Sequence, residues 1–168
     1  RFWFRLYRPH PDERPAPLRR CVSNLFVPVC RKAPSMTSPD EFKFLSQSAS
    51  ICSPSDWNKP SLSKLWLYNL HYFDDFNAKG SDVRVLWHQD LAKRWIQDNP
   101  IGEGNGWEPY PTSLRLVNWI KWVLQGQNPD HEIIHSLAVQ ARWLRKRLEI
   151  HLLGNHLFAN AKALIFAG

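Results

Sequence analysis

The chain has 168 residues, of which 43% are hydrophobic and 22% charged, proportions typical of a globular protein rather than a disordered one. No stretch reaches the roughly 18–20 consecutive apolar residues that a membrane-spanning helix needs, so we expect no membrane span. The net charge is +7, and residues 1–32 carry +6 of it. The positive field therefore belongs to the N-terminal segment, and the rest of the chain is nearly neutral.

Residues 1–60 are rich in proline, serine and arginine, which excludes long helices there. We expect an irregular segment, with short extended pieces at Phe42–Leu45 and, just beyond it, around Leu65–Phe73, where aromatic and branched residues cluster. The basic arm could contact nucleic acid or anionic lipid. A solvated leader, or a strap on a larger body, explains the same charge, and we expect no nucleic-acid partner.

Beyond residue 80 the apolar residues recur with the period of amphipathic helices. The spacing predicts helices from Ser81 to Asn99, from about Thr112 to Gly126, over 130–152, and from an N-cap at Asn155 onward. Short connections between these helices indicate antiparallel hairpins. The second and fourth helices are apolar around much of their circumference, so we expect more helices to cover them, as in a ring. The fold class is mainly α, with residues 61–168 starting a helical domain.

Two metal-binding patterns can be weighed from the residues alone. His131, Glu132 and His135 match the HExxH pattern, in which two histidines on one helix face bind zinc. Asn128-Pro129-Asp130 places them in the first turn of a helix, and no suitable third ligand is evident. The three cysteines show no paired spacing and predict neither a disulfide framework nor a zinc knuckle. We expect no metal and no cofactor, and keep a zinc hydrolase as a lesser alternative.

A glycine-rich loop leads into an aromatic stretch that suits a sugar ligand. Trp107, Glu108 and Tyr110 stand at the mouth of a helix that carries Arg115 and Asn118 on one face. Flat aromatic rings can stack on a sugar ring, and Arg115 could bind a carboxylate or sulfate in a bidentate manner. The same residues would also fit a core in which Trp107, Trp119 and Trp122 are buried and Arg115 pairs with a structural acid such as Glu108.

Two further groups combine amides with imidazoles. If residues 66–73 are extended, Asn69 and His71 point to one side, although a lone histidine among aromatics is more often structural. Asn155 and His156 open the last helix, where an amide donor and a titratable ring meet. Simple helix capping by Asn155 is the alternative reading of that pair.

Three ordered motifs give the chain a resemblance to a known family. They are Leu67–Phe73, Gly106–Arg115 with Asn118-Trp119, and His151–Leu157 continuing into Ala159–Leu164. Together they resemble the heparinase II/III family of polysaccharide lyases, over roughly residues 40–168. The resemblance implies a partial (α/α) toroid of antiparallel helical hairpins, followed by a C-terminal β-sandwich domain of the same chain.

The resemblance also implies a reaction and site residues. It implies β-elimination on an acidic polysaccharide that contains uronic acid, with Asn155 neutralising the C5 carboxylate and His156 assisting as the base or as a second neutralising group. Asn69, His71, Trp107, Glu108, Tyr110, Arg115 and Asn118 are the expected substrate-binding residues. The catalytic tyrosine of the family and its β-sandwich groups would lie beyond residue 168, so the chain is expected to be an inactive fragment.

Other readings of the function remain open at this stage. The helical module could bind glycans, or serve polysaccharide biosynthesis, without lyase activity. The resemblance implies a periplasmic or secreted location, although no signal peptide is visible in the sequence. The identity of the uronate polysaccharide is not indicated by the residues.

Overall fold

The structure is a computed structural model, and it describes residues 9–17, 31–152 and 154–168. A two-stranded antiparallel hairpin comes first, β1 (Glu41–Phe44) and β2 (Gln47–Ser50), and it confirms the extended piece expected at Phe42–Leu45. The helices follow in the order α2 (Lys64–Tyr72), α3 (Val85–Asp98), α4 (Pro109–Leu124), α5 (His131–Arg145) and α6 (Gly154–Ala167). The expected mainly helical class is confirmed.

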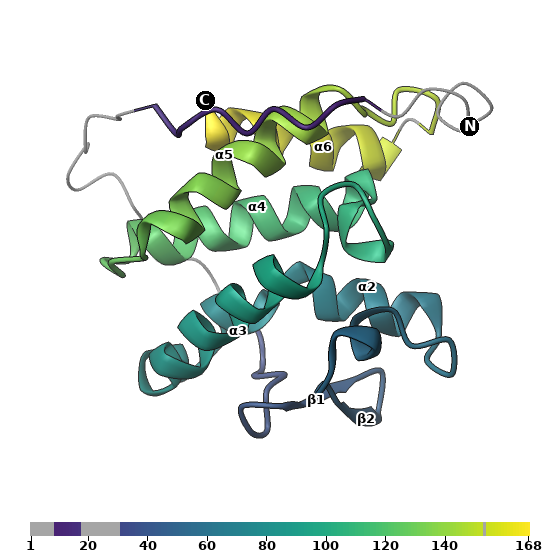
Figure 1. Cartoon of the computed structure of the whole chain (residues 1–168). Helices are drawn as coiled ribbons and strands as arrows, with labels where there is room; N and C mark the ends of the chain where they lie inside the picture. The colour runs from purple at the N-terminus through teal and green to yellow at the C-terminus, as the bar shows by residue number, and fades with distance from the viewer. Residues whose placement is uncertain (1–8, 18–30, 153) are drawn as a thin grey trace.

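Helix α4 lies at the centre of the molecule and positions the other elements. It packs against α2 on one side and against α5 and α6 on the other (Figure 1). Trp119 and Trp122 of α4 are buried, as Trp66 of α2 and Trp95 of α3 are. A helix with apolar residues around most of its circumference must be covered on more than one side, and α4 is covered in this way.

The segment around Leu65–Phe73 is helical, so the extended structure expected there is wrong. The Ser63 side chain caps α2 by accepting a hydrogen bond from the backbone N–H of Trp66. Trp66, Leu67 and Leu70 are buried on one face of the helix. The nine residues of α2 are mostly apolar, so their sequence is compatible with the period of a strand and with that of a helix. Packing against α4 stabilises the helix.

Four helix ends differ from their expected positions. α4 begins at Pro109 rather than near Thr112, because proline is well tolerated in the first turn of a helix. α5 ends at Arg145 rather than Leu152. Asn155 lies within the first turn of α6, which begins at Gly154, so it does not occupy the expected N-cap position. The helix expected from Ser81 begins at Val85, after a short 3-10 turn over Ser81–Arg84.

The described part of the proline-rich segment belongs to the same body as the helices. Met36, Phe42, Ile51 and Trp57 are buried in one cluster with the tryptophans of the helices. Asp75 anchors this segment by accepting hydrogen bonds from the backbone N–H groups of residues 35 and 36, at 2.6 and 3.1 Å. Residues 31–60 therefore share the helical core. The rest of the basic arm, at 1–8 and 18–30, lies outside the described residues.

Candidate functional site

His71 is part of the protein core. Its Nδ1 accepts a hydrogen bond from Nε1 of Trp95 at 3.0 Å, so the proton resides on Nε2, which donates to the carbonyl of Trp57 at 3.0 Å. Burial, together with the nearby Arg115 cation, lowers the pKa of His71 to about 3. His71 is therefore neutral at ordinary pH and ties α2 to α3. Because the segment is helical, the predicted alternation that placed it beside Asn69 does not exist.

Arg115 is also fully buried. Its guanidinium donates to the carbonyl of Gly106 at 2.8 Å and to Oε1 of Gln140 at 2.9 Å. Its central carbon lies 3.8 Å from the centroid of the Trp95 ring, a cation–π contact. Among the described residues no carboxylate contacts it, so the predicted pair with an acid such as Glu108 is wrong. The other part of that alternative, burial of Trp107, Trp119 and Trp122, is confirmed. Arg115 has no surface in this structure from which to bind a carboxylate of a ligand.

Trp107 occupies the same buried region. Only 2% of it is exposed, its Nε1 donates to the carbonyl of Asn99 at 3.0 Å, and its ring lies 5.4 Å from that of Trp95. This ring has no free face on which a sugar could stack. The predicted aromatic loop thus contributes Trp107 to the core rather than to a binding surface.

Asn118 and Asn69, which were predicted to bind substrate, donate hydrogen bonds to nearby groups of the protein. Asn118 donates to the carbonyl of Tyr72 and to a carboxylate oxygen of Asp74, both at 2.8 Å, and so holds the end of α2 against α4. Asn69 donates to the carbonyl of Leu65 one turn earlier in α2, at 2.8 Å. Neither contact involves the last helix.

The structure does bring Tyr110, from the glycine-rich motif, together with His156, from the last motif. Their ring centroids lie 4.5 Å apart, since α6 packs directly on α4. His156 is about two-fifths exposed, with 39% of its side chain accessible. Tyr110 also contacts Tyr72, with ring centroids 6.0 Å apart, and Tyr72 in turn contacts Tyr68, the residue one turn earlier in α2. Tyr68, Tyr110 and His156 are partly exposed and Tyr72 is buried, so the rings form an aromatic surface with a buried member where α2, α4 and α6 meet.

Two carboxylates complete this surface. Glu149 Oε2 lies 3.0 Å from Nδ1 of His156. Glu108 accepts a hydrogen bond from the hydroxyl of Tyr68 and pairs with Lys64 at 2.8 Å. We call the group of six residues the His156 cluster: Tyr68, Tyr72, Glu108, Tyr110, Glu149 and His156.

The electrostatics of the cluster favour neutral tyrosines and an oriented imidazole. Burial and the Glu108 carboxylate raise the pKa of Tyr68 above its ordinary value, and burial together with Tyr110 raises that of Tyr72. The Glu149 carboxylate can only accept, so Nδ1–H of His156 donates to it, and this contact leaves Nε2 as the ring nitrogen that is not held by Glu149. No hydrogen bond to Nε2 occurs among the described residues. The chemistry open to a carboxylate-oriented imidazole is general acid–base chemistry.

Asn160 positions this pair, and its role was not predicted from the sequence. It is fully buried, donates to the hydroxyl of Ser113 at 2.9 Å and accepts from the backbone N–H of Glu149 at 2.8 Å. One side chain therefore fixes α6 on α4 and holds Glu149 near His156. An asparagine one turn after His156 was the available signal, but its partners are distant in sequence. Asn155 lies exposed beside His156 in the first turn of α6.

The HExxH residues occupy the helix start predicted for them, since His131 is the first residue of α5. The rings of His131 and His135 lie parallel, with centroids 6.4 Å apart. Within the described ranges, no set of three or more His, Cys, Asp or Glu side chains is arranged to hold a metal ion. In the same part of the chain, every helix is too short or too polar to cross a membrane.

Comparison of the chain with protein-family models, with curated proteins and with solved structures gives no match.

Proposed function

We propose that the His156 cluster is part of the substrate site of a polysaccharide lyase that cleaves uronic-acid-containing glycans by β-elimination. In this proposal the helices form part of a partial (α/α) toroid, and the protein acts in the periplasm or outside the cell. The observation that carries the proposal is the pair formed by His156 and Glu149. It combines an oriented imidazole with a partly exposed position beside an aromatic surface.

The reaction requires three groups in the site: a base, a group that neutralises the uronate carboxylate, and an acid. A base removes the C5 proton, the electrons of that C–H bond form a C4–C5 double bond, and the C4–O bond breaks as its oxygen is protonated. His156 Nε2 is the group that would take the proton, because Glu149 holds Nδ1. This geometry favours the role of base over that of a second neutralising group, since the Glu149 carboxylate already balances a positive imidazolium.

The carboxylate of the uronate must be neutralised for its α-carbon to lose a proton. Asn155 lies in the first turn of α6, where its amide and the positive end of the helix dipole can stabilise an anion. The Tyr110 ring lies next to His156 and would contact the sugar there. The acid that protonates the leaving oxygen is assigned by the resemblance to a tyrosine beyond residue 168. Trp107 and Arg115 take no part, because they are buried.

The test is an assay of the whole gene product that contains these residues. We expect it to release unsaturated, ultraviolet-absorbing sugars from a uronate polysaccharide such as alginate. The double variant Asn155→Ala, His156→Ala should lose about 10²- to 10⁴-fold in rate, the contribution of a general base.

A matched control uses the other helix-start histidines. The double variant His131→Ala, His135→Ala likewise removes two polar side chains, here both imidazoles, from the start of a helix. It should keep its full rate. A loss of activity there, with unchanged turnover in the first variant, would contradict the assignment and favour the zinc alternative.

A further inference from the structure

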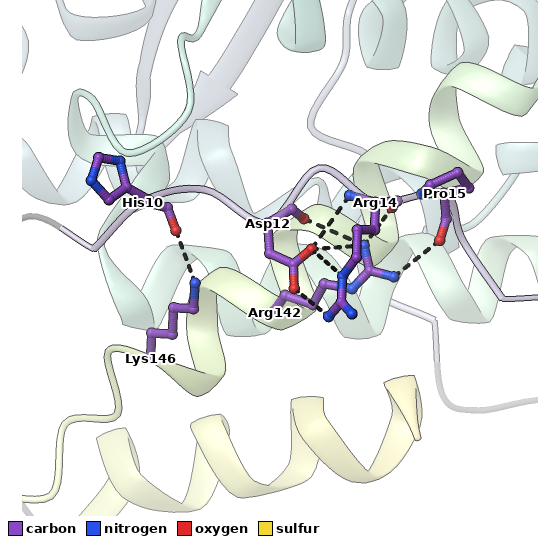
Figure 2. A network of polar contacts seen from close by, with 6 residues as sticks. All are labelled: His10, Asp12, Arg14, Pro15, Arg142 and Lys146. Carbon is purple, nitrogen blue, oxygen red and sulfur yellow. Dashed lines mark hydrogen bonds and ion pairs between the residues drawn. The ribbon is translucent and has the colours of Figure 1, made fainter.

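Residues 9–17 lie across α5 as an extended strap. Four of these nine residues are proline, so the segment has few backbone N–H donors and offers mainly carbonyl oxygens. Figure 2 shows these oxygens facing the basic side chains of α5. The backbone carbonyl oxygens of the strap thus face positively charged side chains of α5.

The contacts are made by two basic residues one helical turn apart. Arg142 donates to the carbonyls of Asp12, Arg14 and Pro15, at 3.3, 2.5 and 3.0 Å (Figure 2). Lys146 donates to the carbonyl of His10 at 2.9 Å. No backbone N–H of the strap is needed for these bonds, so they recognise oxygens and not a particular sequence.

Asp12 adds a carboxylate to the same surface. It lies 3.7 Å from Arg142 and binds Arg14 of the strap through two hydrogen bonds, at 2.9 and 2.7 Å. The hydrogen bond from Arg14, with the field of Arg142, holds the pKa of Asp12 well below its usual range. The strap therefore keeps its negative charge near α5 throughout the neutral pH range.

The basic end of α5 leads directly to the His156 cluster. Arg142 and Lys146, with the exposed Arg145 between them, occupy the last turn of the helix and its C-cap. Glu149, the partner of His156, follows three residues after Lys146. A chain bound at His156 and running along this loop would meet these cations next.

We propose that the basic end of α5, at Arg142, Arg145 and Lys146, binds the uronate chain, and that the strap, residues 9–17, occupies this surface as an internal competitor. The carbonyl oxygens and the Asp12 carboxylate stand in for the hydroxyl and carboxylate oxygens of an acidic glycan. The identity of the ligand rests on the proposed function. The competition itself rests on the contacts of the strap.

The experiment compares two single-charge variants of the strap in the full chain. Asp12→Asn weakens the strap at Arg142, whereas Glu13→Gln removes the same charge from an exposed side chain that has no ion pair within the described part of the chain. Affinity for alginate oligosaccharides is measured by calorimetry. We expect Asp12→Asn to bind about two- to fivefold more tightly than Glu13→Gln, the range of one exposed ion pair. Adding Arg142→Ala should abolish this gain.

The outcomes separate the competing explanations. Equal affinities of the two variants would show an effect of net charge alone and overturn the proposal. A gain for polyglutamate as large as that for alginate would assign the surface to acidic polypeptides and overturn it as well. Failure of the lyase assay, with the difference between the variants intact, would reject only the proposed reaction.

A second measurement follows the strap directly. A glutamate-specific protease can cut after Glu13 when the strap leaves α5, because Arg142 holds the carbonyls on both sides of that residue. Saturating alginate should accelerate this cut several-fold, whereas neutral dextran should not. The free peptide of residues 9–17 controls for inhibition of the protease. Binding of alginate without faster cleavage would contradict displacement.

Discussion

Two polar regions of this molecule use similar residues to opposite effect. In the core, His71 and Arg115 are completely buried, and each ring nitrogen and guanidinium edge meets an acceptor, a donor or an aromatic face. In the His156 cluster the imidazole is partly exposed, with a hydrogen bond at Nδ1 and none at Nε2 from the residues that the structure describes. A polar residue whose hydrogen-bonding groups are all satisfied within the protein stabilises the fold. One that keeps an unsatisfied group at the surface can bind a ligand or transfer a proton.

The largest effect on stability should come from removing the buried hydrogen bonds of Arg115. Arg115→Ala leaves a cavity and unpaired acceptors at Gly106 and Gln140, so it should lower the free energy of unfolding by about 3–5 kcal/mol. Denaturant unfolding followed by tryptophan fluorescence measures this. The exposed Arg145→Ala is the control and should change stability by less than about 0.5 kcal/mol. Similar losses in both variants would show that Arg115 does not support the core.

Gly106 tests how closely the core is packed around His71. A Cβ at this position would lie 2.8 Å from Nδ1 of His71, so Gly106→Ala should cost about 1–3 kcal/mol by overpacking. At Gly126 a Cβ would meet nothing within 4 Å, but its φ of +91° is unfavourable for alanine. Gly126→Ala should therefore cost only about 1 kcal/mol of backbone strain. The ratio of the two losses in thermal unfolding separates packing from strain.

The low pKa of His71 makes the stability of the core depend on pH. The folded-state pKa of about 3 is below the ordinary value of 6.5, so the unfolded chain binds more protons between these values. Stability is therefore full above about pH 6.5 and falls on acidification. From about pH 7.5 to about pH 5.5 the loss should be about 1.4 kcal/mol. His71→Gln should remove this slope, whereas the exposed His151→Gln should keep it.

The smallest effect on stability should come from the cluster. His156→Ala removes one partly exposed hydrogen bond and a ring contact, so it should cost no more than about 0.5–1 kcal/mol. The proposed function requires a large loss of turnover from the same change. Loss of folding by His156→Ala, measured by circular dichroism, would place this residue with the structural group instead.

The sequence allowed the four later helices to be predicted, because their apolar period is clear. It did not reveal that α5 ends at Arg145, since Leu148 and Leu152 continue the same stripe. A tertiary contact accounts for the difference: Asn160 binds the backbone of Glu149 and turns the chain toward α6. Such a contact leaves no periodic signal.

The candidate site was predicted only in part. Tyr110 and His156 were each singled out, and the structure places them in contact. Trp107 and Arg115 are residue types that are typical of sugar-binding sites. Here α3 and α5 bury them, so they are core residues. Glu149 was missed, because a carboxylate seven residues before a histidine across a turn has no recognisable spacing.

The most direct test of the central claim is nuclear magnetic resonance during titration with uronate oligosaccharides. The ring signals of His156 and Tyr110 should shift with saturation, while the indole N–H signals of Trp95 and Trp107 remain in place. Shifts confined to those indoles, with His156 unmoved, would show that the ligand enters the core region and would contradict the account.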